Sequence, residues 1–302
     1  FAGNRTASLQ CQLIIAGREV HVCENVMPIF GVLNIEPAQQ VIREVFLRRI
    51  VKAKGLSKTD SLLSGILMPT PSAVMRAIEL LANGCEEESG IGELLAVDVG
   101  GATTDVYSVS EGAPARANTV CKGLPEPYVK RTVEGDIGMR YSVRGILDAA
   151  GPAKLSRISG LPVPTVLELT QFLREHTDTL PDGDPKLEAL DRALASCAIE
   201  TAVIRHAGSI EEAYTLMGLT YVQTGKDLTP VTNLVVTGGS LIHTTQTSEI
   251  ASYALYDPAQ PMSLRPKEAR VLVDRQYILS AMGLLAASHP ACALRIMKKE
   301  IK

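Results

Sequence analysis

Two glycine turns, each directly after an apolar stretch, hold the residues best suited to chemistry. The first lies in LAVDVGGATTDV, where Gly100 and Gly101 are bracketed by Asp98 and Asp105. Glycines let backbone N–H groups approach an oxyanion, hydroxyls add donors, and a carboxylate can hold a hydrated magnesium ion. This order of strand, polar glycine turn and strand predicts a phosphate site, and therefore a protein that handles a nucleotide.

The second turn follows the apolar run in LVVTGGSLIH, at 234–243. A single Gly-Gly pair after a strand is more often a simple turn than a ligand site. Two such turns favour a site, because ligands of open α/β sheets gather at the carboxyl ends of strands. One loop would serve phosphate and the other adenosine. No GxxxxGK[ST] occurs and no GxGxxG follows a strand, which argues against Walker and Rossmann sites.

Composition is typical of a soluble globular protein. The 302 residues are 46% hydrophobic and 21% charged with a net charge of −3, which fits one large or two modest domains. Aromatic residues are scarce and Trp is absent, so no nucleic-acid surface is expected. No apolar run approaches the roughly 20 residues of a membrane span, and no signal peptide is evident. The scattered cysteines contain no CxxC and predict reduced thiols in a cytoplasmic protein.

The rest of the chain alternates between strand and helix patterns, which predicts an α/β architecture. Irregular structure is expected from 112 to 138, and mostly helix from 142 to about 225 with breaks at prolines. The other predicted elements are short strands at 13–15 and 20–22, helices at 36–54 and 71–83, a strand at 233–236 and a helix at 277–287.

These elements resemble, in the same order, the actin, sugar-kinase and DnaK-type chaperone superfamily. DVGGATTDV resembles its second phosphate loop, VVTGGS its adenosine loop, and MPTPSAVMRAIEL its first connecting helix. EGDIGMR lies where the chaperones open the next helix with a Gly-Gly turn. Longer strings over nearly the whole chain, among them GLPEPYVKRTVEGDIGMRYS, TGKDLTPVTNLVVTGGS and DRQYILSAMGLLA, resemble the glutamate mutase MutL (GlmL) family.

The resemblance implies an actin-like ATPase (ribonuclease H-like) fold. Residues 1–91 would be the remainder of lobe I with the connecting helix, 92–275 lobe II, and 276–302 a C-terminal helix returning toward lobe I. The chain opens on Phe1, too late to contain the superfamily's first phosphate hairpin, and Met68 stands where the chaperones have a glutamate. We therefore expect weak ATP binding and poor hydrolysis by residues 1–302, which tight binding in calorimetry would contradict.

The implied function is an ATP-binding, chaperone-like factor that reactivates an adenosylcobalamin-dependent carbon-skeleton mutase of the glutamate mutase type. The ligands would be ATP or ADP with Mg²⁺, and the adenosylcobalamin would belong to the partner mutase subunits alone. No nucleic-acid or membrane partner is expected, and homo-oligomer formation is left open. Two alternatives remain on the same fold: a small-molecule kinase or ATP-dependent hydrolase, and a nucleotide-binding scaffold.

The resemblance also implies residue roles. Asp98 would hold magnesium through water or orient the attacking water, because positioning and charge stabilisation carry most of phosphoryl transfer. The other implied nucleotide contacts are the backbone of Gly100 and Gly101, the hydroxyls of Thr103 and Thr104, the adenosine-side loop of Gly238, Gly239 and Ser240, and Lys226 with Asp227.

Several of these polar residues also have a structural reading. Lys226 and Asp227 fit a solvated helix end equally well. Asp105 is better read as a brace for its hairpin than as a ligand contact. Arg131, Glu134 and Asp136 fit a solvated charged loop. His206 fits a packed histidine on a helix.

Overall fold

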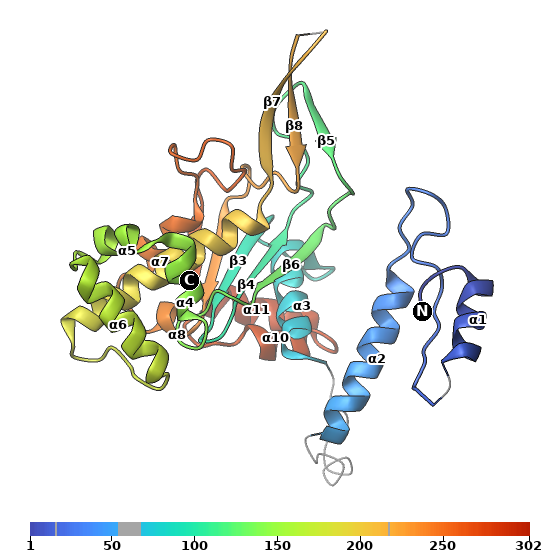
Figure 1. Cartoon of the computed structure of the whole chain (residues 1–302), viewed down its shortest axis with the longest axis horizontal. Helices are drawn as coiled ribbons and strands as arrows, with labels where there is room; N and C mark the ends of the chain where they lie inside the picture. The colour runs from blue at the N-terminus through green and yellow to red at the C-terminus, as the bar shows by residue number, and fades with distance from the viewer. Residues whose placement is uncertain (16, 54–67, 217) are drawn as a thin grey trace. The chain divides into compact units, whose positions relative to one another are not determined.

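The computed structural model describes residues 1–15, 17–53, 68–216 and 218–302. The chain forms two compact units, Phe1–Pro69 and Thr70–Lys302 (Figure 1). Helix α3 (Thr70–Asn83) therefore belongs to the same unit as both glycine turns. The lobe boundary expected near residue 91 stays a prediction.

The first unit holds helices α1 (Arg5–Ile14) and α2 (Glu36–Ala53). The predicted strand at 13–15 is wrong, because α1 extends to Ile14. The Asn4 side chain accepts hydrogen bonds from the backbone N–H groups of Thr6 and Ala7 and so starts this helix. No strand forms at 20–22 either. The helix predicted at 36–54 is confirmed as far as Ala53, and position 54 lies outside the described residues.

The main sheet of the second unit places the two glycine turns. Its strands, in the order β10-β9-β3-β4-β6, are Arg270–Val273, Asn233–Thr237, Leu94–Val99, Thr104–Val109 and Val129–Glu134. Strand β4 is antiparallel to β3 and β6, whereas β9 is parallel to both β3 and β10. The carboxyl ends of β3, β9 and β10 therefore lie at one edge of the sheet, which we call the carboxyl edge.

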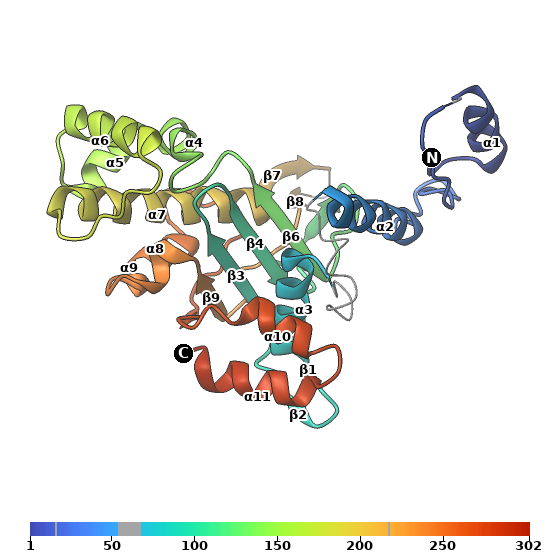
Figure 2. The ribbon, with the colours of Figure 1, turned by 90° about the horizontal axis from the view of Figure 1, so that it is seen from below.

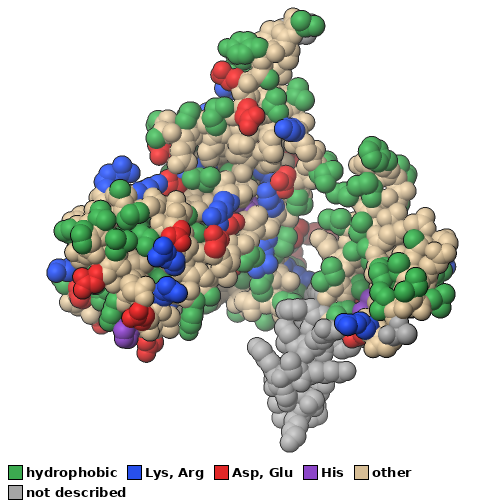
Figure 3. Space-filling view, in the orientation of Figure 1, with side chains coloured by type: hydrophobic (Ala, Val, Ile, Leu, Met, Phe, Trp, Pro, Cys, Tyr) green, Lys and Arg blue, Asp and Glu red, His purple; other side chains and the backbone are tan. Residues whose placement is uncertain are grey.

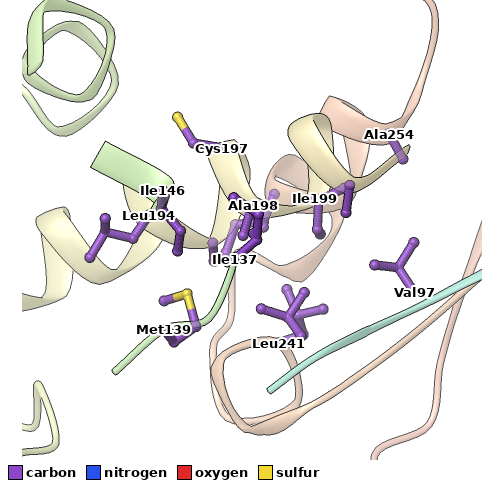
Figure 4. Packing of buried hydrophobic residues seen from close by; sticks show 14 of the residues in the cluster. Val97, Ile137, Met139, Ile146, Leu194, Cys197, Ala198, Ile199, Leu241 and Ala254 are labelled. Carbon is purple, nitrogen blue, oxygen red and sulfur yellow. The ribbon is translucent and has the colours of Figure 1, made fainter. Parts of the chain in front are cut away.

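Helices cover both faces of this sheet (Figure 2). One face packs against α4 (Val143–Ala150), α5 (Pro152–Ser159), α6 (Val163–Glu175) and α7 (Pro185–His206). Figure 4 shows this core, where Val97 of β3 and Leu241 face Ile199 of α7. The other face packs against α3, α10 (Leu279–Leu285) and α11 (Pro290–Glu300).

A second, three-stranded sheet projects from this unit (Figure 1). It contains β5 (Thr119–Lys122), β7 (Ser209–Thr215) and β8 (Gly218–Thr224) in the order β5-β8-β7. The helix predicted to continue to about residue 225 is therefore wrong after His206, where α7 ends. The exposed Tyr214 and Leu216 lie at or next to the turn between β7 and β8. Figure 3 shows hydrophobic side chains at the far end of this sheet.

The remaining elements are short. They are the hairpin of β1 (Gly84–Cys85) and β2 (Glu88–Ser89), helices α8 (Gly239–Ile242) and α9 (Thr247–Ala251), and the 3-10 helix Ser252–Ala254. All six cysteines are free thiols. Among the described residues, no helix is both long and apolar enough to span a membrane.

Candidate functional site

The two glycine turns lie side by side at the carboxyl edge. Strands β3 and β9 are parallel neighbours, with Asp98 in register with Thr237. Gly238 brings their ends together, because a Cβ at this position would lie 2.3 Å from the carbonyl oxygen of Val99. Its φ of +105° is also a conformation that favours glycine. The fold itself therefore requires glycine at 238.

Gly101 and Gly239 are different, because the fold does not require either of them. Among the described residues, a Cβ on Gly101 would meet only the Tyr141 ring, at 4.0 Å, and a Cβ on Gly239 would meet nothing within 4 Å. Neither residue has a positive φ, and both are exposed. At Gly100, by contrast, packing accounts for the glycine, since a Cβ there would lie 2.9 Å from the Thr103 carbonyl oxygen. Gly101 and Gly239 leave open backbone on both turns, as a closely bound ligand would need.

The first turn is held in shape by the segment that precedes α4. The backbone N–H of Met139 donates to the Gly100 carbonyl at 3.0 Å, and those of Arg140 and Tyr141 donate to the Gly101 carbonyl at 2.8 and 2.9 Å. The turn also closes on itself, because the Gly100 N–H donates to the Thr103 carbonyl at 2.9 Å. A rigid turn of this kind loses little entropy when it binds a ligand.

The two threonines of the turn differ in availability. Thr104 is buried, and its hydroxyl donates to the Ile137 carbonyl at 2.9 Å, so it fastens the hairpin to the following segment. Thr103 is half-buried, and within the described part of the chain its hydroxyl has one long contact, donating to the Asp105 carboxylate at 3.4 Å. Asp105 itself pairs with Arg131 of β6 at 2.6 Å, as a brace would. The hydroxyl placed to meet a ligand is that of Thr103.

Four polar side chains share one face of the sheet at the carboxyl edge. Side chains alternate between faces along a strand, so Asp98, Asp105, Thr237 and Asp274 lie on the same face as Ala96, Tyr107, Val235 and Leu272, which pack toward α3, α10 and α11. The Asp274 carboxylate accepts hydrogen bonds from the N–H groups of Ile278 and Leu279, at 2.9 and 3.1 Å, and caps α10.

Asp98 is the least satisfied carboxylate of this group. Its Oδ1 atom is buried and has no hydrogen-bond partner among the described residues, and the same is true of Oγ1 of neighbouring Thr237. Burial, followed by the charges of Asp105 and Asp274, raises the pKa of Asp98 to about 6. Buried polar atoms normally have hydrogen-bond partners, so Oδ1 of Asp98 and Oγ1 of Thr237 mark a place where a cation or a hydrogen-bond donor of a ligand could bind.

The described residues contain no group of three His, Cys, Asp or Glu side chains that could hold a metal on their own. Mg²⁺ commonly binds through one or two carboxylates, keeps several waters and takes its other oxygens from phosphates. Asp98 fits that mode of binding. A magnesium ion here would arrive with its nucleotide rather than occupy a cage made of protein ligands.

Tyr277 completes the carboxyl edge after β10. Its φ of +55° is strained for a tyrosine; the one other described non-glycine residue with positive φ is Asn118, a type that tolerates it. The residue is 57% exposed, although its backbone conformation is unfavourable. The pKa of its phenol is raised, first by the Asp98 charge, then by burial and by Asp274 and Asp105.

Lys226 and Asp227 lie elsewhere. The buried Lys226 ammonium donates to the carbonyls of Pro127 and Tyr128 at 3.0 and 2.8 Å, next to the start of β6. Asp227 accepts from the backbone of Ala115 and Thr229. Because β6 begins opposite Val109, at the far end of β4 from Thr104, the structure does not bring this pair to the glycine turns.

The charged residues at the end of β6 are paired rather than simply solvated. Arg205 binds Glu134 at 2.7 Å and Asp136 at 2.8 Å. His206 is fully buried, as expected for a packed histidine, and contacts the hydroxyls of Thr132 and Ser108. Ser240 of the second turn is half-buried and lies in the first turn of α8.

The sequence reasoning did not identify Thr237, Asp274 or Tyr277 as site residues. A signal for Asp274 was present, because RVLVD repeats the pattern of LAVD: an apolar strand that ends in aspartate. Parallel strands with such ends place both carboxylates at one edge.

Comparison with known proteins gives the family. The family model described as MutL protein matches residues 1–301. Protein MutL of Clostridium tetanomorphum is 44% identical over 300 residues, which cover 99% of this chain and 65% of that protein. The chain thus spans 65% of the length of this curated relative. The match confirms the resemblance seen in the sequence strings, and the chain belongs to the MutL protein family.

Proposed function

We propose that this chain supplies the second phosphate loop and the adenosine loop of an actin-like ATP site, in a protein that reactivates an adenosylcobalamin-dependent mutase. The observation that carries the ATP site is the pair of open glycines, Gly101 and Gly239, beside the unpartnered Oδ1 of Asp98. Backbone donors for phosphate and a carboxylate for hydrated Mg²⁺ stand within one edge of one sheet.

The sheet supports the actin-like fold. An antiparallel hairpin, β3 and β4, carries the first turn, and the parallel strand β9 carries the second directly beside it. A nucleotide at this edge would contact both turns at once, with its phosphates toward Gly101 and its nucleoside toward Gly239.

The residues divide the chemistry between them. The backbone around Gly101 and the hydroxyl of Thr103 would stabilise the phosphate charge, and Asp98 would hold a magnesium-bound water or orient the attacking water. Magnesium supplies positive charge against the phosphates when it is bound. It would also return the Asp98 pKa toward its ordinary value, because an adjacent cation favours the ionised carboxylate.

Membership of the MutL family supports a mutase as the proposed partner, because the sequence resembles proteins that serve glutamate mutase. A cobalamin mutase that has lost its adenosyl group is trapped with a damaged cofactor. An ATPase that binds two conformations of the complex with different affinity can drive the exchange of that cofactor. The mutase subunits are therefore the proposed partners.

The nucleotide site is tested by replacing the open glycines. We expect Mg-ATP to raise the thermal midpoint of the chain, and Gly101→Ala and Gly239→Ala to reduce that shift without lowering the ligand-free midpoint, because neither Cβ would clash with its surroundings. Gly3→Ala is the matched control, since its Cβ also meets nothing within 4 Å. No shift with millimolar Mg-ATP would overturn the ATP site.

The partner is tested separately. An inactivated adenosylcobalamin mutase of the glutamate mutase type should regain turnover when the full-length protein, ATP and fresh cofactor are added. Regain that is equal without ATP, or no regain from a protein that does bind ATP, would overturn the reactivating role and leave the nucleotide site standing.

A further inference from the structure

A small pocket lies at the end of the main sheet that is opposite the glycine turns. Its volume is about 160 Å³. It lies where β9 and β10 begin, on the face of the sheet that α3 and α11 cover (Figure 2). We call it the amino-edge pocket, because the parallel strands β9 and β10 both start there.

The walls of the amino-edge pocket are apolar. They are formed by Leu81, Ile91, Leu272 and Ile301. All of these side chains except the half-buried Ile91 are almost completely buried, so the walls belong to the core of the second unit. A cavity of about 150 Å³ with walls of this kind is large enough for one benzene molecule. The pocket therefore has room for one benzene-sized apolar group, which would be stabilised by leaving water.

Two polar residues at this pocket already have partners within the fold. The Asn233 amide donates to the carbonyls of Ile91 and Glu93, both at 3.1 Å. The Lys298 ammonium pairs with Glu88 at 2.6 Å. These contacts fix the shape of the pocket, and the charge of Lys298 is balanced by its own partner.

Arg270 differs from Lys298, because no carboxylate balances its charge. It is the first residue of β10, is in register with Asn233 and lies on the same face of the sheet as Leu272. It is exposed, and its guanidinium has no ion pair or hydrogen bond within the described part of the chain. A guanidinium can donate to both oxygens of a carboxylate at once. A free one at the mouth of an apolar pocket fits a ligand with a single negative charge.

We propose that the amino-edge pocket binds a small monocarboxylate whose apolar part is about the size of a benzene ring. The apolar part would lie against Leu81, Leu272 and Ile301, and the carboxylate would pair with Arg270. This site is separate from the proposed ATP site, because the glycine turns lie at the opposite ends of β3 and β9. Either site can therefore fail in experiment without the other.

NMR titration of the full chain with benzoate, benzyl alcohol and acetate tests the proposal. Benzoate should bind with a dissociation constant on the order of 1 mM, which is usual for so small a ligand, and should shift the methyl signals of Leu81, Leu272 and Ile301. Benzyl alcohol keeps the ring without the charge and should bind about tenfold more weakly. Acetate keeps the charge without the ring and should also bind at least about tenfold more weakly.

Two substitutions separate the charge from the cavity. Arg270→Gln should weaken benzoate binding about tenfold and change benzyl alcohol binding less than about twofold, because only the charge-assisted hydrogen bonds are lost. Ile91→Phe should weaken the binding of both, because the larger side chain takes up pocket volume. Arg174→Gln is the matched control, since Arg174 is also exposed and has no partner among the described residues, but it lies on α6.

The site is overturned if benzoate leaves the methyl signals of the pocket unmoved at about 20 mM, well above the expected dissociation constant. It is also overturned if Arg270→Gln weakens benzoate and benzyl alcohol equally, because the guanidinium would then not recognise the carboxylate. If Ile91→Phe fails to fold, Arg270→Gln still decides the question, because it changes only an exposed side chain. None of these outcomes bears on the ATP site, which the thermal shift with Mg-ATP tests.

Discussion

At neutral pH the ionised carboxylate of Asp98 destabilises the folded protein. Its pKa of about 6 lies above the ordinary 3.8, because burial and the charges of Asp105 and Asp274 disfavour its ionised form. At this residue the folded chain therefore binds more protons than the unfolded chain between pH 3.8 and 6, and the contribution of Asp98 to stability falls as the pH rises through that window. A carboxylate kept at such a cost fits a group that meets a cation when ligand binds.

Asp98→Asn should consequently stabilise the ligand-free protein at neutral pH. The expected gain in the free energy of unfolding at pH 7.5 is up to about 3 kcal/mol, and it should vanish near pH 3.5, where the native carboxyl is neutral. Urea unfolding at both pH values measures it, with the exposed Asp148→Asn as control. An equal gain at both pH values would show that charge is not the cause.

At this scale the sequence predicts residue types better than their partners. The sequence suggested that the Thr104 hydroxyl contacts a ligand, but this hydroxyl donates to the carbonyl of Ile137, 33 positions along the chain. The sequence also suggested that Lys226 contacts the nucleotide, but its ammonium donates to two carbonyls that lie 98 and 99 positions away in the chain. Such partners are set by tertiary packing. Open glycines need no partner, and the Gly101 and Gly239 turns were identifiable from the sequence.

At the scale of elements, the turn between β10 and α10 combines strong anchoring with strain. Asp274 caps α10 through the N–H groups of Ile278 and Leu279, and the Tyr277 N–H donates back to the Asp274 carbonyl at 3.2 Å. These bonds hold Tyr277 at a φ of +55°, in an exposed position where the charge of Asp98 raises the pKa of its phenol. Strain that persists at the edge of a site is a reason to test the residue for ligand contact.

Tyr277→Asn should stabilise the protein and weaken its ligand binding. Asparagine tolerates a positive φ, so we expect up to about 1 kcal/mol of added stability, together with a smaller thermal shift on adding Mg-ATP. Tyr214→Asn is the control, because Tyr214 is also exposed but lies in strand β7. A loss of stability in Tyr277→Asn would mean that the ring packs usefully where it is.

Elements with strong local signals were predictable, and those without were not. Helix α3 was predicted because Pro71 and Gly84 mark its ends around a clear apolar period, and β9 because it is a continuous apolar run. Strand β6 was missed because Lys130, Arg131 and Thr132 look like a surface loop. Their partners are Glu126, Asp105 and His206, and only Glu126 is close in sequence.

At the scale of the whole second unit, His206 links three elements of the core. It lies at the end of α7, with Nε2 2.8 Å from the Ser108 hydroxyl of β4 and Nδ1 2.8 Å from the Thr132 hydroxyl of β6. Burial lowers its pKa to about 3, and the ammonium groups of Lys130 and Lys226 act in the same direction. This imidazole must be neutral for the sheet and α7 to stay packed together.

His206 and Asp98 respond to acid with opposite signs. The folded pKa of His206 lies below its ordinary 6.5, so its contribution to stability is complete above pH 6.5 and is lost as the pH falls toward 3. Protonation of Asp98 removes a destabilising buried charge, and so adds stability as the pH falls from 6 to 3.8. The shift of His206 is larger, so the balance of the two groups is a loss of stability on acidification.

His206→Gln should therefore produce a crossover in stability. At pH 7.5 the variant should be less stable than the wild type by about 1 to 2 kcal/mol, because an imidazole bonded to two hydroxyls is lost. At pH 4 it should be the more stable protein, because glutamine takes up no proton in the core. Urea unfolding at pH 7.5, 6, 5 and 4, followed by the helical circular dichroism signal, measures both differences. His289→Asn, at an exposed histidine, should show no crossover. A difference between His206→Gln and wild type that stays constant with pH would mean that this histidine is not held neutral by the fold.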